Sequence, residues 1–122
     1  LIDYGYDKHS TGETLQAVKK HEYQGIFESP GKADLSTHVN FKRMHDIISE
    51  CGLTPFGPTY QRKFLSAMGI EERAKTLLKT ATPEQTQDII SALKRLISPD
   101  EMGTLFKVCA ILSTDQIEIA GF

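Results

Sequence analysis

The residues best suited to chemistry in this chain are an acid and two tyrosines near its beginning. Asp3, Tyr4 and Tyr6 lie where a short predicted strand, Leu1–Tyr4, gives way to Gly5 and a polar loop. Open α/β sheets bind their ligands at the carboxyl ends of strands, which makes these side chains candidates for a site. An aspartate in this position is more often a turn former than a catalytic acid, so the residues alone leave both interpretations open.

Histidine supplies the second kind of candidate, because its side chain titrates near neutral pH and can act as a base. The four histidines are His9, His21, His38 and His45. His45 falls on the polar side of a predicted helix, where a solvated side chain is the plain interpretation. His38 lies in a long loop just before that helix and is the better candidate, although a structural hydrogen bond explains it equally well.

Composition indicates an ordinary globular domain and excludes several classes of function. The 122 residues, 39% hydrophobic and 25% charged, suffice for one domain with a core. A net charge of -2 gives no electrostatic signature for nucleic acid or an anionic membrane and so does not favour them, although a local basic cluster such as Lys19-Lys20 or Arg62-Lys63 stays open. The sequence has no glycine-rich phosphate loop, nucleophile elbow or metal-binding His and Cys spacing, and no apolar run of the roughly 18 residues that span a bilayer. Cys51 and Cys109 lie far apart in apolar stretches, which predicts two buried, reduced thiols.

The first third of the chain has weak signals for secondary structure. Residues 13–24 fit a helix or a strand equally well, because Leu15 pairs with Val18 at helical spacing and with Ala17 at strand spacing. Residues 29–37 contain a Pro-Gly turn and small polar side chains, which predicts an irregular, exposed connection.

From residue 40 onward the patterns are clear. Helices are predicted over residues 41–51 with Asn40 as cap, 61–68, 71–80 with Ala74, Leu77 and Leu78 inward, and from a Thr82–Gln85 capping box to Ile97. Leu53–Tyr60 is broken by two prolines, which predicts an edge strand or an irregular extended piece. Leu105–Leu112 is nearly all apolar, which predicts a strand buried on both faces with Leu105, Phe106, Val108 and Ile111 in the core.

These elements predict an α/β fold whose sheet is incomplete. A strand buried on both faces needs neighbours on both edges, and the chain offers only two candidates, of which one begins at residue 1. We therefore expect the C-terminal part of an α/β protein whose other strands lie upstream. The residues alone support an enzyme or a binding domain and no particular reaction.

Five strings, in order, resemble the C-terminal half of the MidA family of S-adenosylmethionine-dependent methyltransferases. They are IDYGY at 2–6, TLQAVKKHEY at 14–23, PGKADLSTHVNF at 30–41, QRKFLSAMGIEER at 61–73 and MGTLFKVCAI at 102–111. The chain departs from the family in having Asn40 where the family has an aspartate, and Arg62 where it often has glycine. Asparagine caps a helix as well as aspartate does, so the first departure matters only if a carboxylate there contacts substrate.

The resemblance implies a C-terminal portion of a Rossmann-like class I methyltransferase sheet, with strands 5, 6 and 7 and helical insertions. Leu1–Tyr4 would be the fifth strand, Leu53–Tyr60 the sixth, and Leu105–Leu112 an antiparallel seventh between them. Residues 1–122 would form the C-terminal part of one domain, with a loop insertion at 7–40 and a helical insertion at 61–103. The N-terminal, cofactor-binding half would lie outside the chain, so no cofactor-binding or metal residue is expected within it.

The resemblance also implies transfer of a methyl group from S-adenosylmethionine to a protein arginine, in eukaryotes on a subunit of respiratory complex I. Arginine stays protonated, so carboxylates must orient it and accept a proton. The predicted catalytic residues are Asp3 and Tyr4, and the predicted substrate-binding residues are Tyr6, Asp34, His38 and Asn40. The location would be the mitochondrial matrix, or the cytoplasm in a bacterium. The alternative is a non-enzymatic protein-interaction or assembly scaffold module.

Overall fold

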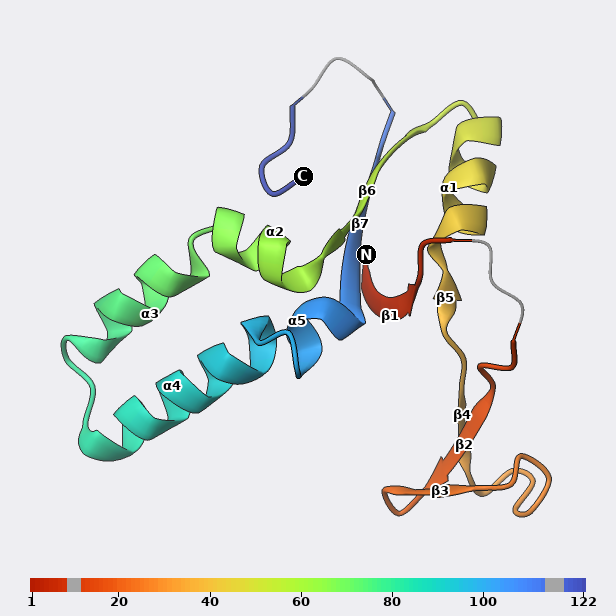
Figure 1. The fold of residues 1–122 in the computed structure, drawn as a ribbon, viewed down its shortest axis with the longest axis horizontal. Helices are drawn as coiled ribbons and strands as arrows, with labels where there is room; N and C mark the ends of the chain where they lie inside the picture. The colour runs from red at the N-terminus through yellow and green to blue at the C-terminus, as the bar shows by residue number, and fades with distance from the viewer. Residues whose placement is uncertain (9–11, 114–117) are drawn as a thin grey trace.

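The computed structural model describes residues 1–8, 12–113 and 118–122, and these form an α/β structure with two sheets. In chain order the elements are β1 (Ile2–Tyr6), β2 (Gln16–Lys19), β3 (Glu22–Gln24), β4 (Asp34–Ser36), β5 (Val39–Asn40), α1 (Phe41–Glu50), β6 (Thr54–Tyr60), α2 (Gln61–Ala67), α3 (Ile70–Leu78), α4 (Pro83–Ile97), α5 (Met102–Leu105) and β7 (Phe106–Leu112). Figure 1 shows β2, β3 and β4 as one arm and α3 and α4 as another, reaching away from the central strands on different sides.

The larger sheet has four strands in the order β5-β1-β7-β6. β1 runs parallel to β5, and β7 lies between β1 and β6, antiparallel to both. The register places Tyr4 opposite Phe106 and Tyr60 opposite Lys107. The prediction of a fifth and a sixth strand with an antiparallel seventh between them is therefore confirmed, with β1, β6 and β7 in those places.

β1 extends to Tyr6, beyond the predicted end of the strand. Its last residues pair with β5, a neighbour that the sequence did not predict. A Cβ atom at Gly5 would lie 2.1 Å from the carbonyl oxygen of Val39 and 2.9 Å from Cε2 of Phe41. Glycine at this position therefore allows β1 to approach both β5 and the start of α1.

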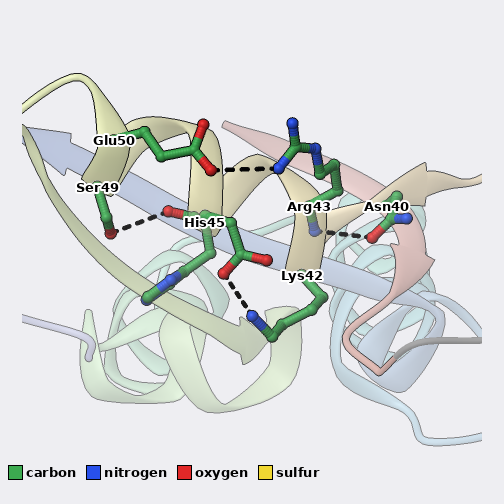
Figure 2. A network of polar contacts seen from close by, with 7 residues as sticks. Asn40, Lys42, Arg43, His45, Ser49 and Glu50 are labelled. Atoms are coloured by element: carbon green, nitrogen blue, oxygen red, sulfur yellow. Dashed lines mark hydrogen bonds and ion pairs between the residues drawn. The ribbon is translucent and has the colours of Figure 1, made fainter.

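α1 begins at Phe41, which is fully buried, and presents Ile48 on the same side, also buried. Asn40 caps the helix as predicted, because its side-chain oxygen accepts a hydrogen bond from the backbone N–H of Arg43 at 2.8 Å (Figure 2). The cap and the buried face together fix α1 directly after β5.

The outer side of α1 carries charged pairs (Figure 2). Lys42 contacts Asp46 one turn away, and Nη1 of Arg43 lies 3.3 Å from Oε1 of Glu50. Pairs as open to water as these contribute little to stability. The position of α1 therefore depends on its apolar side and its cap.

The segment that fitted helix and strand equally is a β-hairpin. Residues 13–24 contain β2 and β3, joined through Lys20 and His21, whose φ angles are 53° and 67°. β4 pairs with the other edge of β2, which gives the order β3-β2-β4. The prediction of an irregular connection over residues 29–37 was wrong for Asp34–Ser36, because pairing with β2 satisfies their backbone groups.

β6 is an edge strand, which is one of the two forms that its prolines allowed, and its register with β7 shifts between Phe56 and Thr59. The three predicted helices that follow are present as α2, α3 and α4. The capping box of α4 forms as predicted: the Thr82 hydroxyl accepts from the Gln85 N–H at 3.3 Å, and the Gln85 side chain accepts from the Thr82 N–H at 3.0 Å.

The buried apolar core of the described residues is small. It consists of Ala17, Phe41, Ile48, Ala74, Val108 and Cys109. Cys109 lies in the middle of β7 and is a free, buried thiol, as predicted.

Four predictions of burial were wrong. Cys51 is a free thiol at the end of α1, where the chain turns into solvent. Leu105 is half exposed because it ends α5 and does not belong to the strand, and Ile111 is 47% exposed although β7 has neighbours on both edges. Leu77 is 43% exposed on the open side of α3. An interior place in a sheet covers the edges of a strand and leaves its faces to other elements.

Candidate functional site

An open pocket of about 320 Å³ lies beside Tyr4, between the larger sheet and the β2–β4 arm. β1 contributes Tyr4, the arm contributes residues from all three of its strands, and α5 closes one side. The lining residues are Tyr4, Gln16, Val18, Tyr23, Ser36, His38 and Leu105. The pocket therefore lies near the carboxyl end of β1, the edge at which α/β sheets bind ligands.

Two predicted site residues, Tyr4 and His38, meet in this pocket. Their ring centroids lie 5.3 Å apart with the planes at 77°, an edge-to-face contact. The Tyr4 ring also meets Phe106, its cross-strand neighbour, edge to face, with the ring centroids 5.7 Å apart and the planes at 85°. Tyr4 thus contacts both an imidazole and a phenyl ring, and the pairing of β1 with β7 sets the second contact.

The backbone before β5 positions His38. Its N–H donates to Oγ1 of Thr14 at 3.4 Å, and Oγ1 of Thr14 lies 2.7 Å from Oγ1 of Thr37. These contacts join Thr14, just before β2, to Thr37 and His38, just after β4. His38 therefore has a structural contact through its backbone, while its ring lines the pocket.

The other predicted site residues do not line this pocket. Asp3 precedes Tyr4 on β1, so its side chain points to the opposite face, and its Oδ1 accepts a hydrogen bond from the Tyr4 N–H at 2.8 Å. Tyr6 lies opposite Asn40, the cap of α1, in the parallel pairing with β5. Asp34 is exposed on β4. Functional roles for these four residues stay predictions.

The remaining histidines lie away from the pocket or outside the described residues. His21 is exposed in the tight turn between β2 and β3. His45 lies on α1, where its carbonyl oxygen accepts a hydrogen bond from the Ser49 hydroxyl at 3.0 Å (Figure 2). His9 lies outside the described residues.

Sequence reasoning missed three polar residues of the lining: Gln16, Tyr23 and Ser36. All three depend on the β2–β4 arm, and the register of that arm aligns Gln16 with Ser36. The available signal was the strand-like spacing of Gln16 and Val18, whose side chains point to the same face of a strand. This signal for a hairpin was weak, because the turn at Lys20 and His21 lacks the Asn-Gly or Asp-Gly pair that marks a hairpin.

The chemistry available in the pocket is that of aromatic faces and neutral polar groups. Tyrosine rings attract a cation placed over their faces, and the Gln16 amide and Ser36 hydroxyl can accept hydrogen bonds from N–H groups. A planar guanidinium offers both a delocalised charge and five donors, so it suits such a lining.

The pocket does not supply the groups that a nucleoside cofactor needs. No aspartate or glutamate is among the residues found to line it, so it offers no carboxylate for ribose hydroxyls. Across residues 1–8, 12–113 and 118–122, no three His, Cys, Asp or Glu side chains gather as metal ligands would. Over the same ranges, no helix combines the length and the apolar character that crossing a membrane requires.

Comparisons with known proteins relate the chain to methyltransferases. Residues 1–59 match a family model for S-adenosyl-L-methionine-dependent methyltransferases. The mitochondrial protein arginine methyltransferase NDUFAF7 of Danio rerio is 32% identical over 117 residues, which cover 96% of this chain and 27% of that protein. Its counterpart in Homo sapiens is 31% identical over 119 residues, covering 97% and 26%. The chain thus spans little more than a quarter of the length of these relatives.

Two crystal structures from Burkholderia thailandensis share the fold. One, with S-adenosyl-homocysteine bound, has a TM-score of 0.79 and 31% sequence identity, over 91% of this chain and 30% of that one. The other, described as uncharacterised, has a TM-score of 0.78 at the same identity, over 93% and 32%. The similarity extends over nearly all of the described fold.

Proposed function

Because the chain is related in sequence and in fold to S-adenosylmethionine-dependent methyltransferases, we propose that it forms the substrate side of a protein arginine methyltransferase. The resemblance to this family, predicted from five strings of residues, is confirmed. The cofactor of the family is S-adenosylmethionine, and one structural neighbour holds its demethylated product.

The observation that carries the proposal is the pocket in which Tyr4 and His38 meet. An arginine side chain entering it would place its guanidinium against the Tyr4 and Tyr23 rings, with Gln16 and Ser36 accepting from its N–H groups. His38 would take up the proton that the guanidinium loses. Asp3, whose carboxylate is tied to the Tyr4 N–H, would act as a positioning residue for that tyrosine.

S-adenosylmethionine supplies the methyl group when it is bound, and the residues of this pocket do not fit its nucleoside. We propose that the cofactor is held by residues that correspond to the further length of the relatives. The part played by this chain is to bind the arginine, to orient it and to accept its proton.

We further propose a subunit of respiratory complex I as the substrate and the mitochondrial matrix as the location. They are supported by relatives named as mitochondrial protein arginine methyltransferases in fish, mammals and invertebrates. A scaffold role is the second candidate. It is favoured by Tyr23, Phe27 and Leu35 on the β2–β4 arm, which are 76%, 85% and 63% exposed.

A chimeric enzyme tests the proposal. The segment of the Danio rerio relative that matches this chain would be replaced by the chain, and calorimetric titration with S-adenosylmethionine would report whether the chimera has assembled. We expect it to methylate arginine in a mitochondrial protein extract, and Tyr4→Ala to abolish methylation while cofactor binding persists. His45→Ala, distant from the pocket, is the matched control.

Two outcomes would separate the candidates. A chimera that binds the cofactor and methylates no arginine would contradict the enzymatic role, and the scaffold role would then be the surviving candidate. Methylation unchanged in both Tyr4→Ala and His38→Ala would remove this pocket from the site. In parallel, S-adenosylmethionine titrated into the chain alone should give no heat of binding, and N-acetyl-arginine amide should shift the backbone resonances around Ser36 more than its lysine analogue does.

A further inference from the structure

An open apolar groove of about 250 Å³ runs between α3 and α4, away from the candidate site. Its aliphatic walls are Ile70, Ala74 and Leu77 on α3 and Ile89, Ala92 and Leu96 on α4. None of the fifteen residues described in α4 is buried, although its pattern of apolar residues is that of a helix packed on one side. An exposed apolar groove of this kind is typical of a surface that binds a partner.

The position of α3 and α4 relative to the open edges of the larger sheet bears on which partner could cover the groove. A further strand could join the larger sheet at β5 or at β6, but β6 carries Pro55 and Pro58, which cannot donate to a ladder. The β5 edge is therefore the edge open to extension. Figure 1 shows α3 and α4 leaving the central strands on the side away from β5.

The charges along α4 are complementary to those of a second copy of α4 that runs in the opposite direction. Acidic residues lie in its first half and basic residues in its last turn. Asp88, Ala92 and Arg95 share one exposed face beside the groove, at i, i+4 and i+7. The ion pairs found in the described part of the chain include neither Asp88 nor Arg95. An antiparallel copy of α4 would set Asp88 of each helix opposite Arg95 of the other.

We propose that the α3–α4 hairpin is a self-association surface, where α4 packs antiparallel on α4 of a second copy of this chain. The two-fold arrangement forms the Asp88–Arg95 pair twice, and the small side chain of Ala92 lets the helices approach between them. The apolar walls of both grooves are then covered in a four-helix arrangement. This inference does not depend on the proposed enzymatic activity.

Sedimentation equilibrium of the 122-residue chain over a range of concentrations tests the proposal. We expect a reversible equilibrium between one and two chains. Ala92→Glu, Asp88→Arg and Arg95→Asp should each weaken dimerisation by about tenfold or more, since each removes a close approach or creates like charges across the two-fold axis. The double variant Asp88→Arg with Arg95→Asp restores both pairs with reversed polarity and should regain most of the affinity.

Two controls make the result specific. Lys94→Glu changes a charge about 100° around the helix from Arg95 and should leave dimerisation unchanged. Circular dichroism of every variant should show the helix content of the parent chain, because the exchanged side chains are exposed. A single-chain mass at all soluble concentrations, or a double variant no tighter than its single components, would overturn the proposal. The first result would leave the groove to another protein or to a further segment of a longer chain.

Discussion

The larger sheet with α1 and the α3–α4 hairpin are built in different ways. In the sheet, Phe41 and Cys109 are almost completely buried, and Gly5 lets two strands and a helix approach more closely than any side chain would permit. In the hairpin, only Ala74 is buried, and α4 is positioned by its capping box and by Gln61, whose Nε2 donates to the Leu96 carbonyl at 2.9 Å. The sheet depends on buried contacts between elements distant in sequence, whereas the hairpin has few buried side chains and combines a local capping box with the long-range contact of Gln61.

This difference bears on function. The candidate pocket lies where the sheet meets the β2–β4 arm, so the ring of Tyr4 is placed by strand pairing and by its contacts with His38 and Phe106. Surfaces that move or associate are expected where few buried contacts hold them, as on the hairpin. Substitutions of graded severity can test whether the two regions do differ in this way.

The largest effect is expected from Phe41→Ala. Phe41 is fully buried, so its removal leaves a cavity between α1 and the sheet and should lower the free energy of unfolding by about 3–5 kcal/mol. Urea denaturation followed by circular dichroism measures this. Phe27→Ala is the matched control, because that ring is 85% exposed and its loss should change little. Equal effects of the two substitutions would contradict the burial of Phe41.

Gly5→Ala should have the next largest effect. The added methyl would lie 2.1 Å from the Val39 carbonyl oxygen, which belongs to backbone and cannot rotate aside. We expect β1 and β5 to separate, with a loss of about 1–3 kcal/mol in urea denaturation. Gly25→Ala provides the comparison, since its nearest atoms are 3.8 Å away. A Gly5→Ala protein as stable as the parent would show that β5 does not pair closely with β1.

Thr82→Ala should have a smaller effect, confined to the hairpin. Loss of the capping box should destabilise α4 by about 1 kcal/mol. Because α4 makes few buried contacts, we expect faster hydrogen exchange in its amides and unchanged exchange in β7. Thr82→Ser keeps the hydroxyl and should keep the protection. Equal acceleration in β7 would mean that hairpin and sheet unfold together and that the comparison fails.

The elements predicted correctly from the sequence are those with local signals. The capping residues Asn40 and Thr82 predicted the starts of α1 and α4, and the prolines of β6 restricted it to an edge strand or an irregular extended piece. β5 and β4 were missed because a strand of two or three residues exists only through its partner, and no local pattern specifies that partner.

The same division applies to the candidate site. Tyr4 and His38 were identified from their places at a strand end and before a helix cap, and they line one pocket. Gln16, Tyr23 and Ser36 come from three strands whose register is set by mutual pairing. Their convergence could not be predicted, because a shift of one residue in any strand turns the side chain to the opposite face.

The smallest effect concerns the pH dependence of the sheet. Burial raises the pKa of the Cys109 thiol above the ordinary value of 9.0, although the nearby N-terminal charge acts in the opposite direction. The folded protein therefore keeps this proton at a pH where the unfolded chain has lost it. The stability due to the buried neutral thiol is present below pH 9 and is lost as the pH rises toward the raised pKa.

Urea denaturation between pH 8 and about pH 10 should therefore show a steeper fall in stability for the parent chain than for Cys109→Ala, which lacks the titrating group. Comparing the slopes, and not the absolute stabilities, separates this titration from the tyrosines and lysines that ionise in the same range. Alkylation at pH 8 gives a second measure: Cys51 is exposed and should react quickly, while Cys109 should react only when the sheet opens. If both thiols react at the same rate, the sheet around β7 opens readily, and the tight burial of Cys109 on which the comparison rests is contradicted.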